Sequence, residues 1–203
     1  MPKIFQVDAF TTEKFKGNPA AVCLLESPAE ESWMQSVAAE MNLSETAFVC
    51  PGVDGYDLRW FTPTIEVDLC GHATLASAFV LYHEGMVSKD QEIRFFTKSG
   101  LLKITKKNDL LEMDFPAEPP RQFMPPPVLT RSLGVTALSA WQNRMDILIE
   151  VENERDLLAA EPDFQALKKL PARGIIVTSR SDDSNYDFKS RFFAPRFGID
   201  EDP

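Results

Sequence analysis

Two short stretches of the chain carry side chains that could move protons. The first is Ser44-Glu45, which stands before the apolar residues Thr46-Ala47-Phe48-Val49-Cys50. A carboxylate at the start of a buried strand is partly desolvated, which raises its pKa toward values useful for a general acid or base. The structural alternative is a helix-to-strand connector with an exposed glutamate.

The second stretch is Cys70-Gly71-His72, which precedes an apolar segment. Gly71 allows close approach of the backbone, and the first N–H groups of a helix form a site for an enolate or a carboxylate. His72 could donate a proton or a hydrogen bond, and Cys70 could have a lowered pKa and act as a base. The alternatives are a buried structural thiol and a capping histidine.

A buried helix should position the second stretch. Residues 71–84 leave almost no polar face, and Gly85 supplies a C-terminal stop. We therefore expect a central helix wrapped by sheet. The expected strands of this first half are 3–10, 20–25, 45–50, 56–61, 92–97, 101–105 and 110–115.

A second helix should precede the Ser44-Glu45 stretch. Ser27 is the expected N-cap, with Pro28 at the first helical position and Glu30 completing a capping box. A stripe of apolar residues at helical spacing should be buried, and Asn42 should end the helix. The stripe is Trp33, Met34, Val37, Ala38 and Met41.

A proline-rich segment marks the expected domain boundary. Prolines cannot join a sheet ladder and keep a chain extended, so we expect domains at 1–117 and 128–203 joined by a linker at 118–127. Beyond it, 146–151, 174–179 and 187–194 are expected strands, and 154–170 is expected to be mostly helix.

The two halves share a weak internal repeat. Arg59-Trp60-Phe61-Thr62-Pro63 through Val67-Asp68 aligns without gaps on Arg191-Phe192-Phe193-Ala194-Pro195 through Ile199-Asp200. A duplicated architecture explains this match. The second half should then continue into its own buried helix, so we expect the second domain to be truncated at Asp202-Pro203.

Composition excludes several classes of function. The formal charge of −10 argues against general nucleic-acid or anionic-membrane binding. Charged residues interrupt every apolar stretch that could span a bilayer, and the N-terminal residues lack the apolar run of a signal peptide. The three cysteines form neither a zinc pattern nor a disulfide framework, and Cys23 and Cys50 should be core residues. Free thiols favour a cytoplasmic protein.

Taken as a set, several motifs resemble the PhzF family of phenazine-biosynthesis isomerases. They are Val7-Asp8-Ala9-Phe10, Gly17-Asn18-Pro19-Ala20, Ser44-Glu45-Thr46-Ala47-Phe48, Phe61-Thr62-Pro63, Cys70-Gly71-His72-Ala73-Thr74 and Glu201-Asp202-Pro203. The resemblance implies an α+β, diaminopimelate-epimerase-like fold. Such a fold has two similar domains, each a mostly antiparallel sheet wrapped round a central helix, with the active site between them.

The resemblance also implies roles for individual residues. Glu45 takes the place of the catalytic acid/base, and Ser44, Gly71, His72 and Asp202 match positions that hold substrate. Without the resemblance, Asp202 would be read as part of a solvated acidic tail. No metal or organic cofactor is implied.

We therefore expect an isomerase that moves a proton on a small carboxylate-bearing metabolite, with Glu45 as acid/base. Cys70 stands where the phenazine enzyme has an acidic residue and where cofactor-independent epimerases have a catalytic cysteine. A cysteine-based racemase or epimerase with Cys70 as second base is therefore the alternative. A non-catalytic truncated family member is a third reading. A homodimer is the expected assembly.

Overall fold

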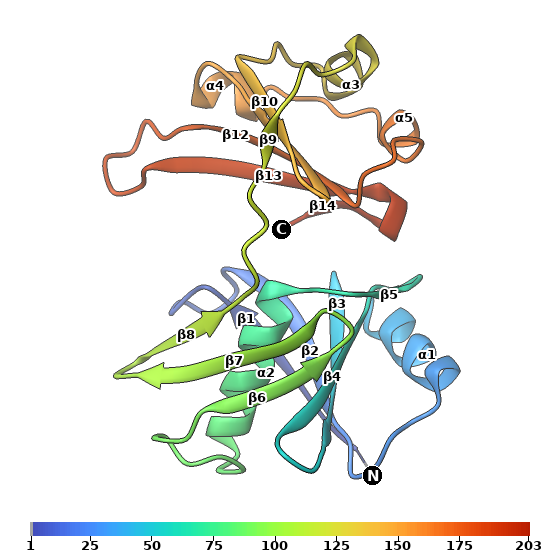
Figure 1. The fold of residues 1–203 in the computed structure, drawn as a ribbon, viewed down its shortest axis with the longest axis vertical. Helices are drawn as coiled ribbons and strands as arrows, with labels where there is room; N and C mark the ends of the chain where they lie inside the picture. The colour runs from blue at the N-terminus through green and yellow to red at the C-terminus, as the bar shows by residue number, and fades with distance from the viewer. Residues whose placement is uncertain (1) are drawn as a thin grey trace. The chain divides into compact units, whose positions relative to one another are not determined.

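The structure, a computed structural model, describes residues 2–203 and divides the chain into two compact units (Figure 1). The first unit ends at Pro116, and the second runs from Ala117 to Asp202. Each unit has its own sheet. Among the described residues, no helix is long and apolar enough to cross a membrane.

The first unit is a curled, mostly antiparallel sheet. Its strands follow the order β1-β2-β3-β4-β6-β7-β8, with β5 paired to β4, and only the pairs β2–β3 and β4–β6 are parallel. The strands are β1 (Lys3–Ala9), β2 (Asn18–Leu24), β3 (Glu45–Pro51), β4 (Tyr56–Phe61), β5 (Glu66–Val67), β6 (Ile93–Thr97), β7 (Gly100–Lys107) and β8 (Leu110–Asp114).

The sheet wraps round the helix α2 (Gly71–His83), as Figure 1 shows. Because α2 is apolar on nearly every side, the sheet can cover nearly every side of it. The observed burial of α2 confirms the expected central helix. Phe79, with 49% of its surface exposed, and His83, near the end of the helix, are the exposed residues. Gly85, at φ +68°, follows the end of the helix.

Helix α1 (Glu31–Met41) begins later than the sequence predicts. Its N-cap is Glu30, whose side chain makes no capping hydrogen bond, so the predicted capping box at Ser27 is wrong. Leu25 is still bonded to the sheet through its N–H and the oxygen of Val49, and Ala29 packs against the core. Residues 26–30 therefore form the connection between the sheet and α1 and are not part of the helix.

The remaining predictions for α1 are partly confirmed. Asn42 ends the helix in the left-handed conformation, at φ +51°, as expected. The predicted buried stripe is narrower than expected: Met34 and Ala38 are buried, whereas Trp33 is exposed and stacks edge-on against Phe48.

An ion network holds the segment that leads into α2. Arg59 on β4 contacts Glu66 on β5 and Glu31 on α1, each at 2.7 Å. Burial would raise the pKa of Glu66, but hydrogen bonds from Arg59 and Lys98 outweigh burial and lower it. The network therefore fixes β5 a few residues before Cys70.

The second unit is a sheet of order β14-β13-β12-β11-β10-β9, in which only β11 and β12 are parallel. Its strands are β9 (Arg121–Gln122), β10 (Ser139–Gln142), β11 (Asp146–Glu150), β12 (Gly174–Arg180), β13 (Phe188–Ala194) and β14 (Ile199–Asp202). The helices are α3 (Pro127–Leu133), α4 (Glu154–Leu158) and α5 (Phe164–Leu167), with a 3-10 turn at Pro195–Phe197.

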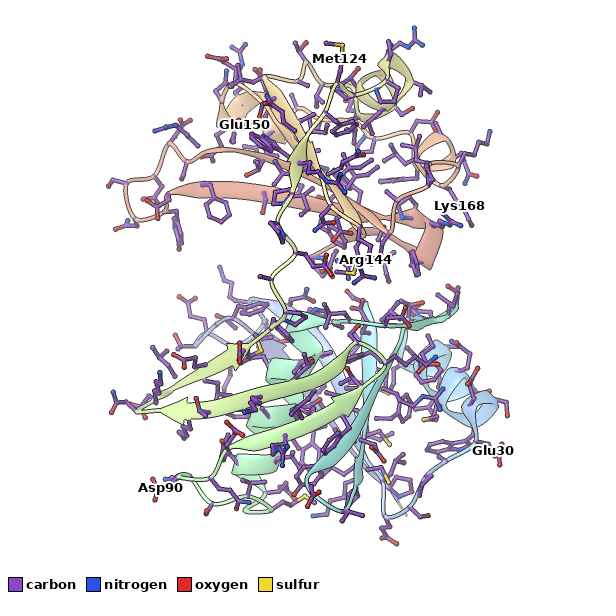
Figure 2. All side chains as sticks on the ribbon, viewed as in Figure 1. Glu30, Asp90, Met124, Arg144, Glu150 and Lys168 are labelled. Atoms are coloured by element: carbon purple, nitrogen blue, oxygen red, sulfur yellow. The ribbon has the colours of Figure 1, made fainter. Side chains whose placement is uncertain are left out.

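One sequence prediction for this unit is wrong. The proline-rich segment does join a sheet: Gln122 pairs with Trp141, because Arg121-Gln122 is a short stretch without proline. The segment 154–170, expected to be mostly helix, contains two short helices, because Pro162 interrupts it. Farther along the proline-rich segment, Met124 is 91% exposed and points away from the unit (Figure 2).

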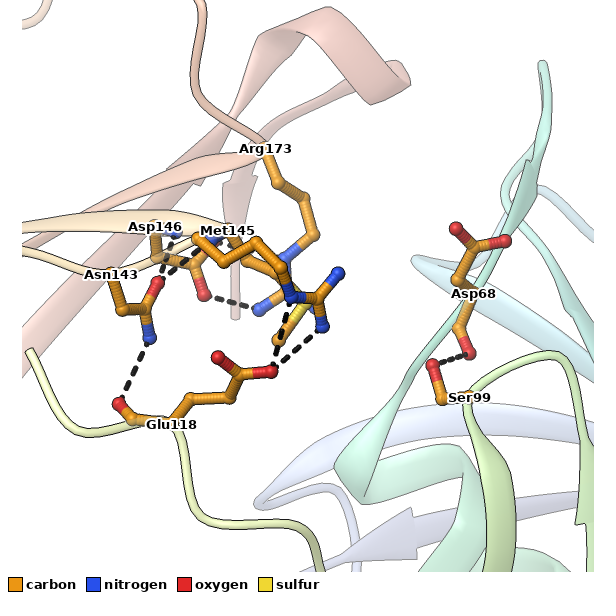
Figure 3. A network of polar contacts seen from close by, with 8 residues as sticks. Asp68, Ser99, Glu118, Asn143, Met145, Asp146 and Arg173 are labelled. Carbon is orange, nitrogen blue, oxygen red and sulfur yellow. Dashed lines mark hydrogen bonds and ion pairs between the residues drawn. The ribbon is translucent and has the colours of Figure 1, made fainter.

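Polar contacts fix the base of β11 and β12 (Figure 3). The side-chain oxygen of Asn143 accepts hydrogen bonds from the backbone N–H groups of Met145 and Asp146. The Asp146 carboxylate pairs with Arg173, which directly precedes β12. These contacts anchor the two parallel strands at their N-terminal ends.

The internal repeat has a structural counterpart. The Arg59 guanidinium lies over the Phe61 ring at 5.2 Å, and the Arg191 guanidinium lies over the Phe193 ring at 5.0 Å. In each unit the strand that carries this pair is followed by a short strand that pairs back onto it. The shared geometry supports a duplicated architecture.

Candidate functional site

The first unit brings Glu45 and His72 together. His72 Nε2 and Glu45 Oε2 lie 3.4 Å apart, and the two side chains are only 5% and 15% exposed. This distance is longer than the ~2.9 Å of a well-formed hydrogen bond, but catalytic contacts commonly tighten when substrate binds. A carboxylate and an imidazole therefore face each other in a largely water-excluded place.

Neighbouring strands position Glu45. It is the first residue of β3, which runs parallel to β2 with Glu45 beside Ala20. The left-handed turn at Asn42 ends α1 and returns the chain to the sheet through half-buried Ser44. Glu45 is therefore carried by a strand inside the sheet, and its side chain is largely buried, unlike the exposed glutamate of the structural alternative.

The N-terminus of α2 positions Cys70 and His72. Cys70 is the N-cap residue, and its carbonyl accepts a hydrogen bond of 2.5 Å from the Thr74 hydroxyl. Just before it, the Ser99 hydroxyl donates to the carbonyl of Asp68 at 2.8 Å (Figure 3). Both contacts fix the backbone from which the thiol and the imidazole project.

The other ring nitrogen of His72 has two side-chain neighbours. Asn18 Nδ2 lies 3.2 Å from His72 Nδ1, and Cys70 Sγ lies 3.6 Å from the same atom. From the sequence, Asn18 was named only as part of a family motif and was not placed in the site. The sequence feature that could have identified Asn18 as a site residue is the position of a polar side chain between Gly17 and an apolar strand.

Among the described residues, Glu45, Cys70 and His72 form the one group of donors with spacing suited to a metal ion. Their donor atoms all lie within 4.8 Å of one another. Thiolate, imidazole and carboxylate are the ligands that zinc takes in proteins. The same three groups can also pass protons without a metal, since each is a weak acid or base.

The other candidate residues have different surroundings. Asp202 is the last residue of β14 and belongs to the second unit. Cys23 and Cys50 are buried free thiols, as expected, and burial raises the pKa of Cys23 to about 11. Those two thiols are therefore poor nucleophiles or bases at neutral pH.

Gly71 leaves open space at the first turn of α2. A Cβ at this position would meet only the Phe115 ring, at 4.0 Å, which is an ordinary van der Waals contact. Packing within the unit therefore does not demand glycine here. Close approach of a bound anion to the backbone N–H groups would demand it.

We expect Gly71→Ala to fold normally and to raise the substrate KM about tenfold, equivalent to about 1.4 kcal/mol of binding free energy. The added methyl group would obstruct the path to the helix N-terminus. Steady-state kinetics would measure the effect, with Gly52→Ala as control because a Cβ there also meets only ordinary contacts. An unchanged KM would show that substrate does not approach Gly71.

Comparison with known proteins identifies related chains. The family model described as "Phenazine biosynthesis-like protein" matches residues 7–203. An uncharacterized isomerase of Halalkalibacterium halodurans is 53% identical over 201 residues, which cover 98% of this chain and 76% of the relative. A PhzF family structure from Enterococcus faecalis has a TM-score of 0.87 and 44% identity, and covers 100% of this chain and 77% of that one.

More distant structures share the fold alone. A predicted epimerase from Pseudomonas aeruginosa is 21% identical with a TM-score of 0.75, and covers 100% of this chain and 76% of its own. Together with the curled sheet round α2, these similarities confirm the expected α+β, epimerase-like fold class.

Proposed function

The chain belongs to the PhzC-PhzF family, and we propose on that basis that it is an isomerase that moves a proton on a small carboxylate-bearing metabolite. Glu45 is the acid/base that takes a proton from one substrate carbon and returns it to another. No metal or organic cofactor takes part.

The observation that carries the proposal is the contact between Glu45 and His72. The carboxylate stands at the start of a buried strand, and the imidazole stands at a helix N-terminus, 3.4 Å away. A partly desolvated carboxylate beside a hydrogen-bond donor is suited to proton abstraction, because the donor can stabilise the charge that develops on substrate.

The other residues of the proposed site bind substrate. The N-terminal N–H groups of α2 at Gly71 and His72 attract the substrate carboxylate or enolate, because they point out of the helix end and the helix dipole favours negative charge there. Ser44, next to Glu45, offers a hydroxyl. On the family resemblance, we propose that Asp202 also holds substrate.

Proton NMR in D2O tests the proposal directly. The chain would be incubated with a panel of small amino and hydroxy carboxylates, including 2,3-dihydro-3-hydroxyanthranilate, with EDTA present throughout. We expect deuterium to appear at one substrate carbon, which would also name the substrate class. Absence of exchange from a folded sample would contradict the proposal and favour a non-catalytic family member.

A cysteine-based epimerase is the second candidate, and it is favoured by the 3.6 Å contact between Cys70 Sγ and His72 Nδ1. In that mechanism the thiolate would be one of two opposed bases.

Cys70→Ser separates the two candidates. If Glu45 is the acid/base, we expect the exchange rate to stay within about tenfold of the unmodified chain, because the serine hydroxyl preserves a donor beside His72. If Cys70 is a base, the loss should reach about 10²–10⁴-fold. Cys50→Ser is the matched control, since Cys50 is a buried thiol on β3 whose hydrogen bond goes to Pro51.

A further inference from the structure

We propose that Asn18 is a positioning residue that holds the neutral His72 imidazole in the tautomer with its proton on Nε2. Asn18 lies outside the set of residues that the family resemblance assigns to the site. Its effect on rate rests on the proposed function, whereas the tautomer itself can be measured without any turnover.

The fold places Asn18 and Glu45 at the same end of two neighbouring strands. Asn18 opens β2 and Glu45 opens β3, and these neighbouring strands run parallel with Ala20 beside Glu45. Because neighbouring parallel strands begin at the same end of the sheet, the side chains of Asn18 and Glu45 can both reach the N-terminus of α2. Asn18 is only 7% exposed.

Gly17 fixes the backbone from which the Asn18 side chain projects. Gly17 has φ +83°, and a Cβ there would lie 2.2 Å from the carbonyl oxygen of Ala9. Only glycine fits this close approach without strain. On the other side, Asn18 pairs with Ala9 across the β1–β2 ladder. The amide therefore enters the site from a rigid position.

The chemistry of the amide decides the tautomer. Asn18 Nδ2 lies 3.2 Å from His72 Nδ1, and an amide NH2 group only donates hydrogen bonds. Nδ1 must therefore accept, and in a neutral imidazole the proton then resides on Nε2. That N–H is the one that faces Glu45 Oε2.

Cys70 is consistent with this assignment in its thiol form. A neutral thiol can donate weakly to Nδ1, as Asn18 does, whereas a thiolate would require a proton on Nδ1. The amide of Asn18 and a Cys70 thiolate thus make opposite demands on one ring nitrogen. The arrangement gives His72 a fixed donor toward Glu45 and the substrate, and disfavours Cys70 as a base.

Two-dimensional NMR of the chain with ¹⁵N-labelled histidine tests the assignment, because the two tautomers differ in their ring nitrogen shifts. The chain has two histidines, and His83→Gln would assign the signals. His83 is stacked on Phe79 at 5.7 Å and serves as an internal reference in the unmodified chain. We expect His72 to be neutral with its proton on Nε2. A proton on Nδ1 in the unmodified chain would overturn the proposal.

Asn18→Asp keeps the shape of the side chain but replaces the donor with an acceptor. We expect His72 to acquire a proton on Nδ1 in this variant, and kcat to fall about 10²-fold with KM changed less than threefold. A retained Nε2 tautomer in folded Asn18→Asp would overturn the role of Asn18. Cys70→Ala should leave the tautomer unchanged, and a switch in that variant would overturn the proposal by assigning the tautomer to Cys70.

Discussion

Glu45→Gln should lower the rate of substrate deuterium exchange about 10²–10⁴-fold while the chain stays folded. Glutamine keeps the shape of the side chain and its ability to accept a hydrogen bond from His72, but it cannot take a proton at neutral pH. The loss should therefore appear in kcat, with only a small change in KM.

The control for this prediction is Glu40→Gln. Glu40 is an exposed carboxylate near the end of α1, so its replacement removes one charge from the same unit without touching the site. We expect the control to exchange at the unmodified rate. Exchange by Glu45→Gln within threefold of the unmodified rate would remove Glu45 from the mechanism.

Phe193→Ala should destabilise the second unit by about 3–5 kcal/mol. Phe193 is fully buried on β13, packs in the core cluster of that unit and contacts the Phe164 ring at 6.3 Å between centroids. Truncation to alanine removes the apolar contacts and leaves a cavity that the surrounding strands cannot close. Urea denaturation followed by circular dichroism would measure the change in unfolding free energy.

Phe188→Ala is the matched control because it lies on the same strand and is 65% exposed. We expect that variant to change stability by about 0.5 kcal/mol or less. The same loss in both variants would mean that the strand, and not the buried ring, sets the stability of the unit.

The sequence determined the elements whose signal is local. Helix α2 was predicted from an apolar run that ends at Gly85, and the strands β3 and β4 from the patterns of their apolar residues. These signals depend on residues close together in the chain, so they survive without tertiary information. The family motifs likewise indicated the fold class, because they occur as a set in a fixed order.

Local signals failed where packing or proline competed with them. The capping pattern at Ser27 did not form a helix start, because a hydrogen bond from Leu25 to the sheet and a core contact of Ala29 hold this segment outside the helix. The proline-rich segment was read as excluded from sheets, yet Arg121-Gln122 pairs with β10, since only the residues without proline need to form the ladder.

The chemistry of the candidate site was decided by tertiary structure. The sequence supplied Glu45, Cys70 and His72 as reactive types, but their mutual distances depend on how β3 and α2 pack. Asn18 is 54 residues from His72 in the chain, and its contact with Nδ1 arises only because β2 lies between β1 and β3 beside the helix N-terminus. Residue type fixes which protons a group can hold, whereas the hydrogen-bond partners that decide where a proton resides are brought together only by the folded sheet.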